Sequence, residues 1–95
     1  MAEVEITSSS RKGKRLMATF GPRTVHFGSD GEAFVDHKDP EIKAAWEARH
    51  RVREDWTNLT TAGALAKHVL WNKPTIQASI KDLNKRQSDY KFIYK

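Results

Sequence analysis

The sequence contains no cysteine, which excludes disulfide bonds, thiolate metal sites and a thiol nucleophile. It has no run of about twenty apolar residues, so we expect no membrane-spanning segment. Its serines lie outside any nucleophile-elbow motif, and its glycines do not form a phosphate-binding loop. We therefore expect a protein that is not an enzyme and that needs no cofactor or metal. The remaining enzymatic alternative is a metal or acid–base site built from His37, His50 and the carboxylates near them.

Acidic side chains are scarce in the last forty residues. Residues 1–55 contain ten basic and ten acidic side chains, whereas residues 56–95 contain seven basic and two acidic ones. The whole net charge of +5 therefore comes from the second segment. Such a concentration of positive charge suits nucleic acid, an acidic protein partner or a lipid surface, and it is also typical of a solubilising face.

The rest of the chain is organised around the stretch from residue 60 to residue 86. Apolar residues recur there with helical spacing, which predicts one helix over 61–71 and a second over 74–86. Pro74 disfavours helix in the residue before it and fits the opening turn of the helix that follows, so a tight corner is expected between the two. The large apolar ring of Trp71 at this corner should join both helices to the fold. The predicted core consists of Trp46, Trp56, Leu65, Val69, Trp71, Pro74, Ile76, Ile80 and Leu83.

Other signals complete an α+β prediction for a single domain over residues 15–95. Asp39 as N-cap, followed by Pro40, predicts a helix over 39–54. Two short apolar runs on either side of a Gly-Pro break predict a β-hairpin, and an aromatic run at the C-terminus predicts a third strand paired with it. The expected fold has three helices and a small antiparallel sheet formed by 15–20, 24–28 and 90–94.

Residues 1–14 mix charges with three consecutive serines, which predicts a flexible basic arm. The arm could bind a phosphate backbone or an acidic groove, or only aid solubility. Residues 33–35 are expected to be a short extended piece or loop anchor.

The helix pair also resembles the helix-turn-helix half of winged-helix regulators. With the apolar residues facing inward, Gln77 would point outward to read a base edge, and Lys81 and Lys85 would hold phosphates. Three features oppose this interpretation: the turn lacks glycine, Ala78 occupies a central outward position, and Asp82 would face the phosphates. The candidate residues for binding nucleic acid or a protein partner are Arg11, Lys12, Lys14, Arg15, Arg49, Arg51, Arg53, Lys73, Gln77, Lys81, Lys85 and Arg86.

Several short motifs of the chain are distinctive. They are His26-Phe27-Gly28, His37-Lys38-Asp39-Pro40, Ala48-Arg49-His50-Arg51, Arg53-Glu54-Asp55-Trp56, Thr61-Ala62-Gly63, Leu70-Trp71-Asn72-Lys73-Pro74-Thr75 and Ser79-Ile80. Together they resemble an uncharacterised family of small basic proteins encoded by large double-stranded DNA viruses of algae and protists. The resemblance covers roughly residues 25–86 and departs from the family at 64–68, where relatives carry bulkier aromatic residues.

This resemblance implies a viral context rather than a mechanism. We expect a non-enzymatic structural component of the virion, made in the host cell during assembly: a minor capsid or capsid-associated protein that binds neighbouring coat subunits. The alternative is an accessory protein that binds viral double-stranded DNA through the helix pair and the basic second half of the chain.

Overall fold

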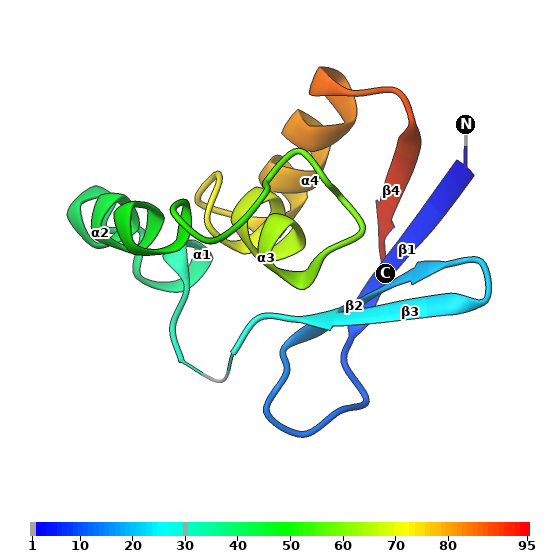
Figure 1. Cartoon of the computed structure of the whole chain (residues 1–95), viewed down its shortest axis with the longest axis horizontal. Coiled ribbons are helices and arrows are strands. Elements are labelled where there is room, and N and C mark those ends of the chain that lie inside the picture. The colour runs from blue at the N-terminus through cyan, green and yellow to red at the C-terminus, as the bar shows by residue number, and fades with distance from the viewer. Residues whose placement is uncertain (1, 30) are drawn as a thin grey trace.

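The computed structural model describes residues 2–29 and 31–95, and it confirms a single α+β domain (Figure 1). The helices lie together on one face of a four-stranded sheet. In chain order the elements are β1 (Ala2–Ser8), β2 (Leu16–Phe20), β3 (Arg23–Phe27), α1 (Phe34–His37), α2 (Pro40–His50), α3 (Ala62–Leu65), the π-helical segment η1 (Ala66–Leu70), α4 (Ile76–Arg86) and β4 (Tyr90–Tyr94).

The sheet is mixed, with strand order β3-β2-β1-β4. The predicted hairpin is present as β2 and β3, which pair antiparallel. The expectation that the C-terminal strand pairs with this hairpin is wrong, because β4 pairs parallel with β1 and places Val4 opposite Phe92. The first and last strands of the chain are thus direct neighbours (Figure 1).

The prediction of a flexible N-terminal arm is also wrong, since most of that segment forms β1. Its side chains alternate between the two faces of the sheet, with Val4 and Ile6 buried and Glu3 and Glu5 exposed. This period of two is the signature of a half-buried strand. The charged and serine-rich residues hid the pattern, because only two apolar side chains of β1 enter the core. Residues 9–15 remain outside the strands as a loop between β1 and β2.

The core forms where the covered face of the sheet meets the helices. Apolar side chains with at most 5% exposure come from all four strands and from α3, η1 and α4. They are Val4, Ile6, Leu16, Ala18, Phe27, Ala64, Leu65, Val69, Leu70, Ile80, Leu83 and Phe92, together with Ala33 before α1. Trp71 is 8% exposed and joins this cluster at the corner between η1 and α4.

The helices differ from their predicted limits in ways with clear local causes. Helix α2 begins as expected, with Asp39 accepting hydrogen bonds from the first turn, but it ends at His50 and not near residue 54. Like charges four residues apart, at Arg49 and Arg53, oppose its continuation. Residues 34–37 form α1 instead of an extended piece, because the Asp36 carboxylate accepts the Ala33 N–H at 2.8 Å.

The helix predicted over 61–71 is α3 followed directly by η1, and the one predicted over 74–86 is α4, which begins after its N-cap Thr75. Pro74, expected in the core, therefore lies before the helix in the exposed corner. Within the described residues, none of these helices is long and apolar enough to cross a membrane.

Replacing Ile6 with alanine tests whether β1 belongs to the folded core. Ile6 has no exposed surface, so Ile6→Ala should lower the free energy of unfolding by about 2–5 kcal/mol. Glu3→Ala, on the exposed face of the same strand, should change it by less than about 0.5 kcal/mol. Urea denaturation of both variants measures the difference, and equal tolerance of the two changes would mean that β1 is not held in the sheet.

Candidate functional site

The exposed side of α4 and the corner before it carry four polar side chains, Lys73, Gln77, Lys81 and Lys85, which we call the α4 row. All four are exposed and follow one another at intervals of four residues. Within the helix, residues four apart lie on the same side, about 6 Å apart along the axis. The structure therefore brings together these four members of the set predicted from the sequence.

Local hydrogen bonds explain why α4 presents this side to solvent. The Thr75 hydroxyl accepts the Ala78 N–H at 3.1 Å and caps the helix. The Ser79 side chain is fully buried, and its hydroxyl accepts the Lys73 N–H at 2.9 Å. Because Ile80 also faces the core, the orientation of the helix is fixed and the α4 row points outward.

Asp82, which the sequence placed against a phosphate backbone, is held by its neighbours. Its carboxylate accepts a hydrogen bond from the Asn72 amide at 2.9 Å and another from Arg86 Nε at 2.7 Å. The Asn72 hydrogen bond is the main cause that lowers the pKa of Asp82, and the Arg86 charge adds to it. Arg86, predicted to bind a partner, is thus engaged within the fold, and the charge of Asp82 is offset beside the α4 row.

His68 on η1 extends this hydrogen-bonded network. Its Nε2 lies 2.8 Å from the Trp56 carbonyl oxygen, and its Nδ1 lies 3.2 Å from Arg86 Nη2. The arrangement fits a neutral ring in which Nε2–H donates to the carbonyl and Nδ1 accepts from the guanidinium. Burial is the main cause that lowers the pKa of His68, and the nearby charges of Arg86 and Lys67 act in the same direction.

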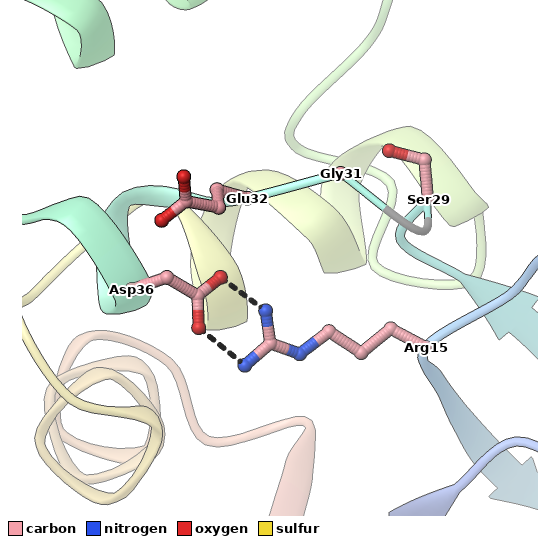
Figure 2. Close-up of a pocket in the computed structure, with 5 residues that line it drawn as sticks. All are labelled: Arg15, Ser29, Gly31, Glu32 and Asp36. Carbon is pink, nitrogen blue, oxygen red and sulfur yellow. Dashed lines mark hydrogen bonds and ion pairs between the residues drawn. The ribbon is translucent and has the colours of Figure 1, made fainter.

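The loop between β1 and β2 carries the second group of predicted cations. Arg11, Lys12 and Lys14 are exposed there, whereas Arg15 is turned toward α1. Arg15 forms a two-pronged ion pair with Asp36, in which Nη2 lies 2.9 Å from Oδ1 (Figure 2). This contact raises the pKa of Arg15 and lowers the pKa of Asp36. Arg15 therefore connects the loop to α1, and its charge is already paired. Arg11 and Lys12 are exposed and can contact a partner.

The ion pair borders a recess of about 330 Å³, lined also by Ser29, Gly31 and Glu32 (Figure 2). Asp36 already accepts hydrogen bonds from Arg15 and from the Ala33 backbone. Arg15 and Asp36 neutralise each other, and the single remaining carboxylate of Glu32 does not by itself indicate a ligand, so we assign the recess none.

Arg49, Arg51 and Arg53 form a third basic group at the end of α2. All three are exposed, and no carboxylate within the described residues pairs with them. The two acidic side chains nearest in sequence have other partners: Glu47 pairs with Lys67 at 2.9 Å, and Glu54 accepts the Trp56 indole N–H at 3.2 Å.

An aromatic cluster supports this part of the fold, and sequence reasoning did not identify how its rings meet. The Trp46 ring stacks on Trp71 with centroids 4.6 Å apart and on His50 at 4.3 Å. The ring of His37 lies 5.4 Å from that of Trp71, and its buried Nε2 has no hydrogen-bond partner among the described residues. Because Nδ1 accepts the Asp39 N–H, Nε2 carries the proton of the neutral ring. In the sequence, the four-residue spacing of Trp46 and His50, which places both rings on one side of a helix, was the pattern that could have indicated their stacking.

Three other residues that the sequence predicted to lie in the core are only half-buried. Trp46 and Ile76 are half-buried against the core, and Trp56 is half-buried with its ring parallel to Trp46.

No three metal-binding side chains come together in residues 2–29 and 31–95, so the structure assembles no metal site from His37 and His50 there.

The basic groups of the β1–β2 loop and of the α4 row do not form one surface. Figure 1 places the β1–β2 loop at the bottom of the view, and the C-terminal end of α4 near the top. The loop and the α4 row therefore face different surroundings.

The lowered pKa of His68 predicts a pH-dependent stability. The unfolded chain, with a histidine pKa of about 6.5, binds more protons than the folded chain below that value. The contribution of neutral His68 to the free energy of unfolding is therefore fully present above pH 6.5. It is lost as the pH falls toward the lower pKa of the folded state.

His68→Gln keeps a donor for the Trp56 carbonyl and an acceptor for Arg86 but does not titrate. Thermal melts between pH 7 and pH 5 should show a smaller loss for this variant than for the wild type. Parallel curves would show that His68 is not the titrating group.

Comparison with known proteins gives one match. Residues 4–50, just under half of the chain, match a family described as a family of unknown function, DUF5754. The match runs from β1 through α2 and overlaps the resemblance found in the sequence between residues 25 and 50. No curated protein and no solved structure is significantly similar to the chain. What the comparisons support is thus a likeness, over residues 4–50, to a family to which no activity is assigned.

Proposed function

We propose that the protein binds double-stranded nucleic acid through the α4 row, largely without reading sequence. The observation that carries this proposal is the exposure of Lys73, Gln77, Lys81 and Lys85 along one side of α4 with no carboxylate paired to them in the described residues. An α-helix fits the major groove of B-form DNA, and lysines along its side contact phosphates. Gln77 can contact a base edge, but the three lysines carry the charge of the row, so phosphate contacts dominate.

The contacts of Asp82 support this proposal. An unpaired carboxylate next to Lys81 would repel the phosphate backbone, because like charges at short distance cost free energy. Asn72 and Arg86 hold the Asp82 carboxylate at 2.9 and 2.7 Å and offset its charge. The charge of Asp82, one of the three features that opposed nucleic-acid binding, is therefore a smaller obstacle in the folded chain than the sequence alone indicated.

The separation of the basic groups favours a second candidate role. Arg11 and Lys12 lie on the β1–β2 loop, away from α4 (Figure 1). Two separate cationic surfaces suit a capsid-associated linker that holds nucleic acid on one side and an acidic surface of a coat protein on the other. The resemblance to small basic viral proteins motivates this role, with the virion as its location.

A titration of duplex DNA at several salt concentrations tests the main proposal. The affinity should fall steeply as salt rises, because each neutralised phosphate releases counterions. Replacing Lys81 and Lys85 together with alanine should reduce the slope of log K against log salt by about 1.8. Fluorescence anisotropy with a labelled random-sequence duplex gives both slopes.

The matched control removes the same charge elsewhere. Lys14 in the β1–β2 loop and Lys91 on β4 are exposed and pair with no carboxylate in the described residues, and changing both to alanine should leave the slope unaltered. Equal effects of the two double variants would place duplex binding outside the α4 row. Arg11→Ala with Lys12→Ala then tests the linker role: it should weaken binding to an acidic coat protein while duplex affinity is retained.

A further inference from the structure

The outer edge of β4 is covered by two side-chain amides. Asn84 donates to the Phe92 carbonyl at 2.9 Å and accepts the Phe92 N–H at 2.8 Å. Gln87 donates to the Tyr90 carbonyl at 2.9 Å and accepts the Tyr90 N–H at 3.0 Å. Tyr90 and Phe92 direct these backbone groups away from β1, so each amide takes the place of a residue in a neighbouring strand and covers the first two of the three outward-facing positions of β4. Covering an edge in this way prevents another chain from pairing with it.

The opposite edge of the sheet, β3, has no such cover. The Phe27 carbonyl accepts the Arg15 N–H at 3.2 Å, which shows that Phe27 directs its backbone groups toward β2. Because antiparallel pairing alternates, Thr24 and His26 direct their N–H and C=O groups away from the sheet. No hydrogen bond of residues 2–29 and 31–95 reaches these four groups, and Thr24 is exposed.

We propose that β3 is a self-association edge that pairs with β3 of a second copy of this chain. Antiparallel pairing about Val25 brings Thr24 opposite His26 of the second copy and His26 opposite its Thr24. Both copies then use their outward-facing groups in four N–H···O=C bonds, and the two sheets become one. This register is self-complementary, as an interface with twofold symmetry requires.

The side chains fit the same register. Arg23 falls opposite Phe27 of the second copy, so the two Arg23 charges lie several residues apart along the strands. Thr24, a β-branched residue that favours strands, faces a histidine and not a like charge. Since side-chain amides cover β4 at Tyr90 and Phe92, the assembly closes at two copies instead of growing along both edges.

Sedimentation equilibrium of the protein without nucleic acid tests this proposal. The mass should rise from 10.9 kDa toward twice that value as the concentration increases. Thr24→Pro removes an outward N–H from each copy while leaving the bonds between β2 and β3 intact, and proline is tolerated in an edge strand when its N–H would face solvent. We expect this variant to weaken the dimer at least tenfold. Thr24→Val is the matched control, since it keeps the backbone N–H and should dimerise like the wild type.

A monomeric mass at every concentration, or a Thr24→Pro variant that dimerises as tightly as the wild type, would overturn the proposal. The double variant Asn84→Ala and Gln87→Ala gives a second measurement that does not depend on the proline. With the β4 edge uncovered, it should form species larger than a dimer. If its mass distribution matches that of the wild type, the amides do not control association. Circular dichroism of each variant confirms that the fold is retained, and none of these outcomes depends on duplex binding.

Discussion

The parallel pairing of β1 with β4 is the constraint on which the rest of the structure depends. It joins residues from the two ends of the chain, with Val4 opposite Phe92 and Ile6 opposite Tyr94. Parallel neighbours require a long connection that crosses one face of the sheet. Here the connection includes the β2–β3 hairpin and all the helices, of which α3 and α4 pack on one face of the sheet. The core therefore lies on that face, and the other face carries exposed charges such as Glu3 and Lys91.

The same architecture decides which charges are available to a partner. Arg15, Arg86 and Lys67 look alike in the sequence as surplus cations, but each is paired with a carboxylate from the fold. The α4 row and the three arginines at the end of α2 have no such partner within the described residues. A net charge of +5 thus underlies the proposed binding function only where cations are left without carboxylates.

The corner between η1 and α4 shows how one buried serine and a set of partly exposed polar contacts support an exposed surface. Ser79 fixes the backbone of Lys73, while Asn72 and Arg86 hold Asp82 beside the α4 row. His68 continues this network toward the Trp56 carbonyl and so connects α4 with the segment that follows α2. Hydrogen-bonded groups of this kind define a single geometry, because a buried polar atom without a partner is costly.

By itself, the sequence determined the elements whose signals are local. The Asp39-Pro40 helix start, the hairpin around the Gly-Pro turn, the helix–corner–helix with Trp71 and the α+β class follow from capping, turn chemistry and apolar spacing. Even the outward direction of Gln77, Lys81 and Lys85 follows from helical periodicity.

Only the tertiary structure decided how distant segments meet. Residues 2–8 have just two inward apolar side chains, and they become a strand because β2 and β4 supply hydrogen-bond partners on both sides. The pairing of Arg15 with Asp36, the restraint of Asp82 by Asn72, and the amide cover of β4 each join residues whose spacing obeys no periodic rule. Such contacts depend on the path of the whole chain, because ion pairs and side-chain amides select partners by position in space rather than by separation in sequence.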